Sequence, residues 1–323
     1  MMSLTEPFLV DPARVVGPVL VTGASGCIGS WVVAILHQSG VPVIACDLED
    51  NRSRLSLLIG EAEANAVVWE ILDVTGGEVL SNFCKTKNIT SIIHLAGLMI
   101  PFCKADPARG ARVNVEGTIN VLEAARHNGI KKLAYASSSA IHGMPPVGPT
   151  IATLYGAYKL ANEYTAKVYW LDWGVPSIGI RPNVVYGVGR DQGMTSEFTV
   201  GMAHVAMGEA FQVSYGGPIS WLYAGEAAAA FIAAVCNDGE EALVFDLNGT
   251  CMSVEEGLEV LSKLAPDHGM TTSGTSLPVP ADLSDQPIRD FLADYPSVSP
   301  TDGIKWTLDA FTKLNAERKL AAR

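Results

Sequence analysis

Short apolar runs alternate with stretches of helical spacing through the first half of the chain. Between the runs, apolar residues recur at helical intervals, as at Ile28, Val32, Ile35 and Leu36 before Gly40, and again over residues 113–126. Strands that are apolar throughout and alternate with helices are typical of a parallel sheet covered on both faces. The pattern predicts a doubly wound α/β fold, which binds ligands at the carboxyl ends of its strands. Five runs, each bounded by Gly, Asp or Asn, are predicted to form the strands: residues 18–22, 43–46, 66–69, 91–95 and 132–136.

The second half of the chain loses this rhythm. Glycine and proline cluster at residues 187–193 and 216–218, and residues 264–303 are rich in Pro, Ser, Thr and Asp. Such punctuation is typical of turns and loops. We therefore predict a smaller, loop-rich α+β lobe after about residue 185.

Composition excludes several classes of protein. The chain of 323 residues carries 22 Lys and Arg against 34 Asp and Glu, a net charge of −12, and has no dense basic cluster. Nucleic-acid binding, which needs such a cluster to neutralise phosphates, is not expected. The longest apolar run, residues 227–236, is far shorter than the roughly 20 residues of a membrane-spanning helix. The first residues also show no secretory signal, so no membrane association is expected.

Cysteine and histidine spacing indicates neither a disulfide framework nor a metal site. The six cysteines are widely spaced without a C-x-x-C pair, and the six histidines lack an H-x-x-x-H pair. Cysteine within apolar runs behaves as a small hydrophobic residue. We predict reduced cysteines, a cytoplasmic location and no bound metal.

Three glycines, Gly23, Gly26 and Gly29, follow the first predicted strand and open a helix. The free N–H groups and the positive end of the helix dipole at such a turn bind a pyrophosphate. The glycine spacing alone is weak evidence, and an ordinary tight strand-to-helix turn is the alternative.

Asp47 ends the second predicted strand, where a carboxylate accepts hydrogen bonds from the adenosine ribose of a dinucleotide. A carboxylate at this position would repel a 2′-phosphate, which favours NAD over NADP. Arg52 and Arg54 lie near enough in sequence to oppose this preference, and a solvated loop acid is the alternative for Asp47. Asp73 follows the third run in the same way and could meet the adenine amine.

Tyr155 and Lys159 form a Tyr-x-x-x-Lys pair, whose spacing places both side chains on one face of a helix. An ammonium group beside a phenol favours the phenolate and lowers the phenol pKa from about 10. Tyr155 is therefore a candidate general acid or base. Ser137, Ser138 and Ser139 follow the fifth predicted strand and supply a hydroxyl at the same edge of the sheet.

In this order the motifs resemble those of the extended short-chain dehydrogenase/reductases, the NAD-dependent epimerase/dehydratase family. The resemblance extends from about residue 18 to the C-terminus. It implies a Rossmann-type NAD-binding domain over residues 1–185 and a substrate-binding lobe over residues 186–323, with some later segments returning to the sheet. It also implies a homodimer formed through the helix of Tyr155 and the helix of residues 113–126. The segments that carry it are TGASGCIG (22–29), Asp47, Asp73-Val74, HLAG (94–97), NVEGTINVLEAA (114–125), YASSSAIHG (135–143), YGAYK (155–159), RPNVVYG (181–187) and SPTDGI (299–304).

The resemblance also implies a role for each matching residue. Tyr155 would donate and accept the proton, and Lys159 would bind the nicotinamide ribose while lowering the pKa of Tyr155. Ser138 would be the catalytic hydroxyl, because it stands four residues before His142-Gly143, and Asn114 would support the site. The residues expected to bind NAD are Gly23, Ser25, Gly26, Cys27, Ile28, Gly29, Asp47, Leu48, Asp73, Val74, Leu95, Ala96, Gly97, Tyr155, Lys159, Pro182 and Val184. The residues expected to contact a small-molecule substrate are Met99, Ser139, His142, Arg190, Gln192 and Trp221.

Two positions depart from the pattern of the family. Many nucleotide-sugar members carry an arginine that binds the diphosphate where this chain has Ile219, and isoleucine cannot form bidentate hydrogen bonds to phosphate. His142 replaces the usual tyrosine, with a substrate contact and a structural loop histidine as the two alternatives. For the loop of Arg190 and Gln192, a solvated turn is the alternative.

The leading hypothesis is a hydride transfer between NAD and a compact substrate, such as a sugar, a sugar acid or a related secondary alcohol. The first alternative is a nucleotide-sugar 4-epimerase that retains NAD. The second is a non-catalytic NAD-binding sensor, which the intact set of Ser138, Tyr155 and Lys159 disfavours. Dehydration is disfavoured because Ser139 and Ala140 cannot serve as its acid/base pair.

Overall fold

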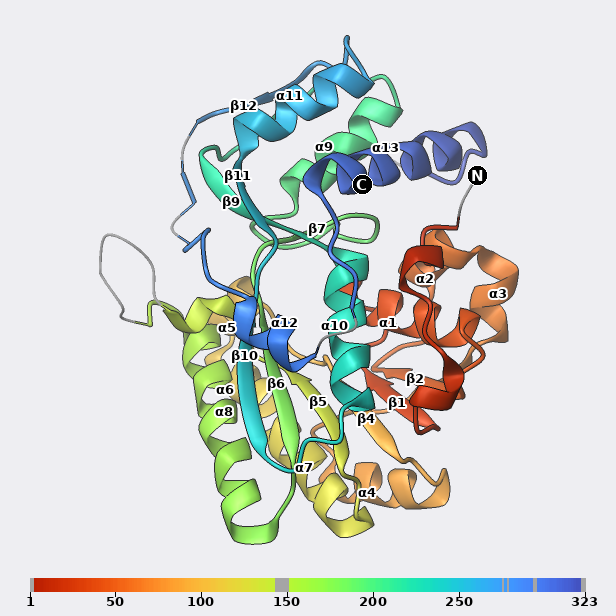
Figure 1. Ribbon diagram of the computed structural model, residues 1–323, viewed down its shortest axis with the longest axis vertical. Helices are drawn as coiled ribbons and strands as arrows, with labels where there is room; N and C mark the ends of the chain where they lie inside the picture. Colours follow the sequence, from red (N-terminus) through yellow and green to blue (C-terminus); the bar gives the residue numbers. More distant parts are fainter. Residues whose placement is uncertain (1–2, 143–150, 275, 278, 293–294, 321–323) are drawn as a thin grey trace.

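A seven-stranded parallel sheet forms the centre of the molecule (Figure 1). The computed structural model describes residues 3–142, 151–274, 276–277, 279–292 and 295–320. The strand order is β10-β6-β5-β4-β1-β2-β3, so the chain crosses over between β3 and β4 as a doubly wound fold requires. The five predicted strands are confirmed to within two residues at each boundary. The strands of this sheet are β1 (Val19–Thr22), β2 (Val43–Asp47), β3 (Val68–Ile71), β4 (Ser91–His94), β5 (Lys132–Ala136), β6 (Ser177–Pro182) and β10 (Ala242–Leu247).

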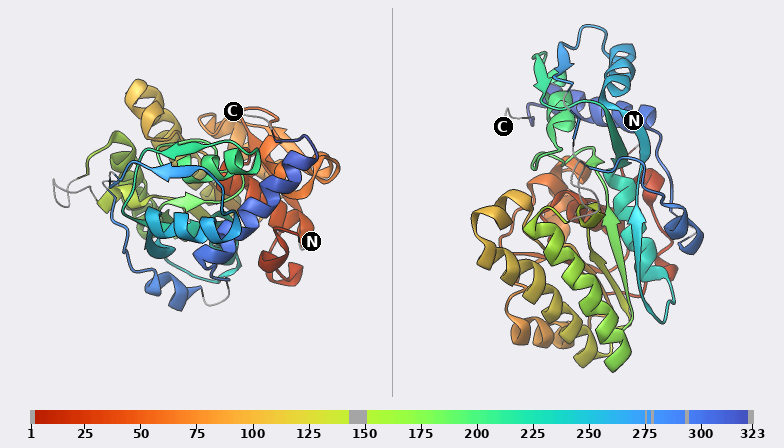
Figure 2. Two further views of the ribbon diagram at one scale, coloured as in Figure 1. Left: turned by 90° about the horizontal axis from the view of Figure 1, so that it is seen from above. Right: turned by 90° about the vertical axis from the view of Figure 1, so that its left-hand side faces the viewer.

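Helices cover both faces of the sheet, as the right-hand view of Figure 2 shows. Because side chains alternate along a strand, Val19 and Val21 of β1 pack into one core cluster and Leu20 packs into the other. On the first face lie α1 (Cys27–Gln38) and α10 (Ala224–Cys236), which contact each other. On the second face lie α4 (Gly77–Thr86), α7 (Gly117–Asn128) and α8 (Leu154–Trp173). The apolar run at residues 227–236 is thus a helix buried on all sides.

The N-termini of α8 and α1 position the two helices that contribute most to the site. The helix α8 begins at Thr153, whose side chain accepts a hydrogen bond from the Gly156 N–H, and ends at Gly174 in the left-handed conformation. This cap places Tyr155 in the first turn of α8, beside the end of β5. The helix α1 begins at Gly26 without a side-chain cap, so its first N–H groups remain available to a ligand.

A smaller lobe lies above the carboxyl edge of the sheet (Figure 1). It contains one three-stranded sheet, in the order β11-β9-β7, and one two-stranded sheet of β12 and β8. The chain beyond residue 185 also returns to the large sheet, since β10 pairs with β6 in parallel and α10 packs against β5. The strands of the lobe are β7 (Val185–Tyr186), β8 (Phe211–Val213), β9 (Pro218–Tyr223), β11 (Thr250–Ser253) and β12 (Met270–Thr272), and its helices are α9 (Glu197–Ala206), α11 (Val254–Leu264) and α13 (Pro300–Ala316).

The remaining elements are short connections. Of these, the π-helical turn η3 matters most, because it leads into α7 and contains Asn114. The connections are η1 (Glu6–Phe8), η2 (Pro12–Arg14), α2 (Ser53–Ile59), α3 (Glu61–Ala66), α5 (Ile100–Ala105), α6 (Pro107–Ala111), η3 (Arg112–Glu116), η4 (Ser139–His142) and α12 (Gln286–Phe291).

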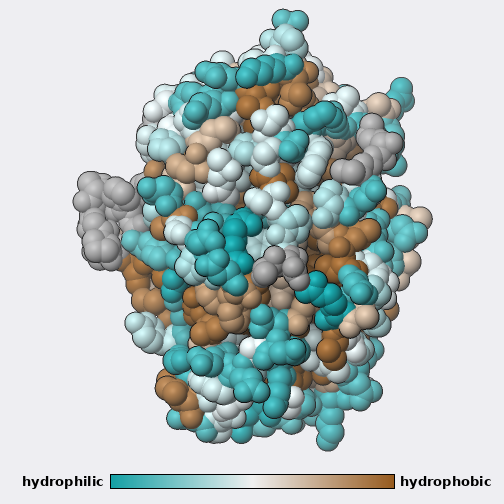
Figure 3. Space-filling model, in the orientation of Figure 1, coloured by the Kyte–Doolittle hydropathy of each residue, from teal (hydrophilic) through white to brown (hydrophobic). Residues whose placement is uncertain are grey.

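The surface is mainly polar on the face that Figure 3 shows, where apolar residues gather in separate patches. Among the helices that the structure describes, none is long and apolar enough to cross a membrane. The described residues also contain no group of three or more His, Cys, Asp or Glu side chains that could hold a metal ion.

Candidate active site

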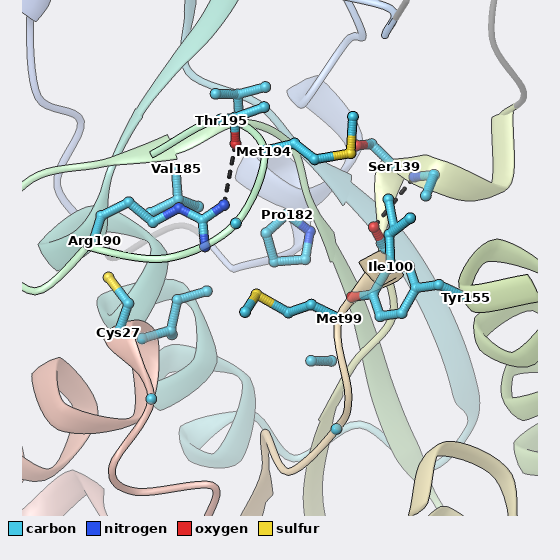
Figure 4. A pocket seen from close by; sticks show the side chains of 18 of the residues that line it. Cys27, Met99, Ile100, Ser139, Tyr155, Pro182, Val185, Arg190, Met194 and Thr195 are labelled. Atoms are coloured by element: carbon cyan, nitrogen blue, oxygen red, sulfur yellow. Dashed lines mark hydrogen bonds between the residues drawn. The ribbon is translucent and has the colours of Figure 1, made fainter. Parts of the chain in front are cut away.

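A pocket of about 360 Å³ lies at the carboxyl ends of β1, β4, β5 and β6, where the sheet meets the smaller lobe. Its walls come from the glycine turn, the loops after β4 and β5, the start of α8, the loop of residues 189–195, and residues 277, 279 and 280 (Figure 4). The expected site residues that line it are Gly23, Gly26, Cys27, Ile28, Gly29, Leu95, Gly97, Met99, Ser138, Ser139, Tyr155, Lys159, Pro182, Val184, Arg190 and Gln192.

The glycine turn leaves room for a ligand because side chains are excluded from it. Gly23 has a φ of +72°, and a Cβ atom there would lie 2.6 Å from the backbone of Leu95 and Ala96. A Cβ atom on Gly29 would lie 2.1 Å from the carbonyl oxygen of Gly23. Both positions therefore require glycine, and the backbone can approach a pyrophosphate closely at the N-terminus of α1. These residues fit the diphosphate of a dinucleotide.

Asp47 lies at the edge of this turn and is held by it. Its carboxylate accepts hydrogen bonds from the N–H and hydroxyl groups of Ser25 and from the N–H of Leu48. The two arginines that the sequence places nearby are already occupied. Arg54 donates to Asp191 and to the Ser25 carbonyl oxygen, and Arg52 pairs with Asp50 at 2.6 Å. The local charge therefore suits a ribose diol better than a 2′-phosphate.

Tyr155, Ser138 and Lys159 come together on one wall of the pocket. The Ser138 hydroxyl accepts a hydrogen bond from the Ala140 N–H at 3.2 Å, which leaves its own proton available to donate. Burial raises the pKa of Tyr155, whereas the hydrogen bond from Ser138 and the charge of Arg190 lower it. Figure 4 shows the Tyr155 hydroxyl directed toward the cavity.

Lys159 is buried one helical turn beyond Tyr155. Its Nζ atom donates to the Ala136 carbonyl oxygen at 2.6 Å and lies 5.6 Å from the centre of the Tyr155 ring. Burial lowers the pKa of Lys159 to about 8. The nearby Glu163 carboxylate acts in the opposite direction. At neutral pH the lysine is thus mainly charged and faces the phenol.

Asn114 is held rigidly behind this wall. Its Nδ2 atom donates to the carbonyl oxygens of Leu98 and Gly110, and its backbone carbonyl oxygen accepts from Asn162 Nδ2. The Oδ1 atom is buried and accepts no hydrogen bond from the described residues. A Cβ atom on Gly97 would lie 2.7 Å from this Oδ1 and 3.5 Å from Lys159 Nζ. An acceptor and an ammonium group therefore face the same small space beside Gly97.

Several expected residues lie outside the pocket walls. Asp73 caps a turn by accepting from the Thr75 N–H, and the Val74 side chain lies where a Cβ atom on Gly117 would come. His142 contacts Asp246 at 2.6 Å, and its expected partner Gly143 lies outside the described residues. The expected residues outside the walls are Ser25, Asp47, Leu48, Asp73, Val74, Ala96, Asn114, His142 and Trp221.

The expected substrate contact of Trp221 is wrong. The side chain is completely buried in β9, its indole donates to the Met252 carbonyl oxygen, and its ring packs edge-on against Phe198 and Tyr186. Ile219, two residues earlier on the same strand, is also buried and lines no part of the pocket. This stretch of β9 forms the core of the lobe rather than a ligand site.

Sequence reasoning missed the segment that closes the pocket from the smaller lobe. Leu277, Val279 and Pro280 line the cavity, and Asn183 at the end of β6 donates to the Pro280 carbonyl oxygen at 2.8 Å. The same asparagine accepts from Ser139, so one amide joins the two walls. No local pattern marks these positions, since the contact joins residues about a hundred positions apart.

Comparison with known proteins agrees with this geometry. A model of the NAD-dependent epimerase/dehydratase family matches residues 19–245. The chain belongs to this family. It is an enzyme of the extended short-chain dehydrogenase/reductase type, and its cofactor is NAD.

Relatives in this epimerase/dehydratase family include two UDP-glucose 4-epimerases. The mouse enzyme is 32% identical over 139 residues, covering 41% of this chain and 40% of its own. The enzyme of Mycolicibacterium smegmatis is 31% identical over 181 residues, covering 53% of this chain and 57% of its own. The chain thus spans about half the length of these curated relatives.

Solved structures of the family share the fold over nearly the whole chain. The UDP-glucose 4-epimerase of Thermus thermophilus in complex with NAD is 25% identical, with a TM-score of 0.74, and the match covers 91% of this chain and 98% of that one. The L-threonine dehydrogenase of Clostridium difficile has a TM-score of 0.78 at 20% identity, over 94% of this chain and 98% of that one. At this identity the second match shows the fold alone.

Proposed function

We propose that this epimerase/dehydratase family member is an NAD-dependent dehydrogenase. It interconverts a secondary alcohol and its ketone on a compact hydroxylated substrate, such as a sugar, a sugar acid or a related alcohol. The observation that carries the proposal is the convergence of Ser138, Tyr155 and Lys159 on one wall of the pocket. These groups supply a proton acceptor, a hydrogen bond to the reacting oxygen and a charge that favours the phenolate.

In this proposal the Tyr155 oxygen accepts the proton of the substrate hydroxyl during oxidation and returns it during reduction. Ser138 donates a hydrogen bond at the same place and fixes the substrate oxygen near the phenol. Lys159 stabilises the phenolate through its charge and holds a ribose hydroxyl. When bound, NAD would supply the hydride acceptor or donor for the carbon that carries the hydroxyl. Gly23, Gly26 and Gly29 would hold its pyrophosphate, and Asp47 its adenosine ribose.

A compact substrate is supported by what the pocket lacks. Nucleotide-sugar members of the family carry an arginine for the diphosphate at the position of Ile219, which is here a buried apolar residue. Without that arginine a nucleotide-sugar diphosphate would lose a bidentate cationic partner, which supports a small substrate over a nucleotide sugar.

A substrate panel tests this function directly. Purified enzyme with NAD is offered free sugars, sugar acids and UDP-sugars, and NADH absorbance is recorded. We expect NADH to accumulate with at least one compact alcohol. Isomerisation of a UDP-sugar without added NAD and without NADH accumulation would instead identify a 4-epimerase, the activity named for several relatives.

UDP binding provides an independent test by calorimetry. We expect weak or undetectable UDP binding beside NAD binding in the micromolar range or tighter, because a lost charge-assisted hydrogen bond of about 1.5–3 kcal/mol weakens binding roughly 10- to 100-fold. Tight UDP binding that collapses in Arg190→Ala would overturn the compact-substrate proposal.

We further propose that the enzyme is a cytoplasmic homodimer. The helix α8 exposes an apolar stripe of Tyr164, Val168 and Leu171, which are 69%, 47% and 68% exposed and lie one and two turns apart. A second copy of the chain covers this stripe in the proposed dimer.

The cysteines support the proposed cytoplasmic location. All six cysteines of the chain are unpaired, which is typical of proteins in a reducing compartment.

The mass in solution tests the dimer. We expect Leu171→Glu to give the monomer mass in analytical ultracentrifugation, because a carboxylate would be buried without a partner. The matched control is Val79→Glu on α4. Val79 is 62% exposed, close to the value for Leu171, and this variant should remain dimeric. A monomeric wild-type protein would refute the proposal.

A further inference from the structure

Arg190 enters the pocket from the smaller lobe without an acidic partner among the described residues. Its Nη2 atom donates to the Thr195 hydroxyl at 3.1 Å, and its Nε atom is buried and donates to no described group. A buried guanidinium donor without an acceptor is costly unless a ligand supplies one. Figure 4 shows this guanidinium inside the cavity, with Met99 on one side and Met194 on the other.

The loop around Arg190 is shaped to hold its guanidinium. Gly189 and Gly193 flank it with φ of +88° and +97°, values that favour glycine. A Cβ atom on Gly193 would lie 3.1 Å from Arg190 Nη2 and 3.4 Å from Met99 Sδ, so the loop packs tightly over the charge. The adjacent Asp191 does not neutralise Arg190 through a described contact, because its carboxylate accepts two hydrogen bonds from Arg54.

The described walls of the pocket are electrostatically positive, although the chain carries a net charge of −12. They contain three basic side chains, Arg54, Lys159 and Arg190, and one carboxylate, Asp191. Arg190 and Tyr155 line the same cavity, and the charge of Arg190 lowers the pKa of Tyr155. An anion is therefore favoured in the cavity that the loop of residues 189–195 and the phenol both line.

We propose that Arg190 binds a carboxylate of the substrate, which makes the substrate a compact hydroxy acid of the sugar-acid class. The inference rests on the proposed dehydrogenase function. The Nε–H of Arg190 supplies one donor, and the Thr195 hydroxyl, which accepts from Nη2, can turn its own proton to the same anion. The Gln192 amide lines the same part of the cavity. Arginine pairs with a carboxylate in a fixed geometry, and apolar walls strengthen the pair by excluding water.

The pyrophosphate of NAD is the other anion that Arg190 could meet, because the charge of Arg190 also acts on Cys27 in the glycine turn. The N–H groups at the N-terminus of α1 already suit that pyrophosphate. A substrate anion near Tyr155, in contrast, finds no other described cation of the pocket walls without a partner. Lys159 is engaged by Ala136, and Arg54 by Asp191. The substrate is therefore the better candidate.

Paired probes of equal shape test the charge preference. Threonate and gluconate are compared with their uncharged amides on the enzyme with saturating NAD, using NADH absorbance. We expect the acid to exceed its amide by roughly 10- to 100-fold in kcat/KM, as expected for a charge-assisted hydrogen bond. Arg190→Gln should remove this advantage by lowering kcat/KM for the acid at least tenfold more than for its amide, with the NAD dissociation constant within about twofold of wild type. The matched control, Arg109→Gln on the exposed surface of α6, should behave as wild type.

Each other outcome has a defined meaning. Equal losses for acid and amide, or a weakened NAD affinity in Arg190→Gln, would assign the arginine to the cofactor or the scaffold and overturn the proposal. If no probe is oxidised, calorimetry of the acids with the NAD-loaded protein separates the two proposals. Acid binding that disappears in Arg190→Gln would uphold the carboxylate site and reject the dehydrogenase activity. Absence of binding for every acid would reject the carboxylate site.

Discussion

The substitution Glu163→Gln tests the ion-pair network behind the catalytic wall. Glu163 lies on α8 one turn beyond Lys159, and only 6% of its side chain is exposed. Its two oxygens accept from Arg181 Nε at 2.8 Å and Arg181 Nη2 at 2.7 Å, and the Ser137 hydroxyl donates to the first of them. Arg181 also forms an ion pair with Asp246, whose carboxylate in turn contacts His142. Glutamine keeps the size of the side chain but turns an N–H₂ group toward donors that need acceptors.

The cost follows from this geometry. Removing one partner of a buried ion pair typically costs 3–5 kcal/mol, because the other charge stays buried. Arg181 is 19% exposed and keeps Asp246 at 3.4 Å, so we expect about 2–3 kcal/mol. That is a large share of the roughly 5–15 kcal/mol by which a folded protein is stable.

Urea unfolding at neutral pH measures this loss. We expect the midpoint of Glu163→Gln to fall without a change in the slope. The matched control is Asp309→Asn, which breaks the exposed pair with Lys305 and should cost less than about 1 kcal/mol. The double variant Glu163→Leu with Arg181→Met should regain much of the stability, since neither member of this pair is left buried without the other. Equal midpoints for Glu163→Gln and Asp309→Asn would refute the reasoning.

Three further predictions concern the site itself. Tyr155→Phe keeps the ring but removes the proton acceptor, so turnover measured by NADH absorbance should fall on the order of 10²-fold or more with NAD binding nearly intact; near-normal turnover would place the acid/base elsewhere. Asp47→Ala should weaken the preference for NAD over NADP in kcat/KM, and a wild-type preference for NADP would contradict this. Lys159 has a pKa of about 8 when folded against roughly 10.4 unfolded, so the unfolded chain binds more protons between these values. The free energy of unfolding of wild type should therefore rise relative to Lys159→Met by about 2–3 kcal/mol from pH 8 to 10; parallel curves for the two proteins would refute it.

The sequence pattern predicted the first five strands because each is a continuous apolar run with a turn residue beside it. It did not predict β10, since Ala242–Leu247 contains Asp246 and four of its residues are only partly buried. What makes this segment a strand is its pairing with β6, which lies some 65 positions earlier. Pairing between distant segments overrides local propensity, so the return of the chain to the sheet could not be read locally.

The site residues also fall into those that local sequence determines and those that distant contacts determine. Tyr155, Lys159 and Ser138 could be predicted because their roles depend on spacing within one helix and on the end of one strand. Trp221 could not be placed, because all residues of β9 after Pro218 are buried and only the folded lobe shows that none of them lines the pocket. Asn183 and Pro280 escaped for a different reason: their hydrogen bond exists only once the lobe has folded onto the sheet.

The catalytic wall of the pocket does not by itself determine which substrate is bound. The same Ser, Tyr and Lys groups would serve any secondary alcohol, so specificity has to come from the smaller lobe. Where many nucleotide-sugar enzymes of the family place an arginine, this chain has Ile219, which is buried on β9 opposite Met252 of β11. Among the described residues that line the pocket, Arg190 is instead a cation with a buried donor, its Nε, that has no described acceptor. Arg190 and Tyr155 line the same cavity, so an anion bound by Arg190 would share that cavity with the reacting hydroxyl. An apolar residue at position 219 together with a cation at position 190 therefore favours a small acid over a nucleotide sugar as the substrate.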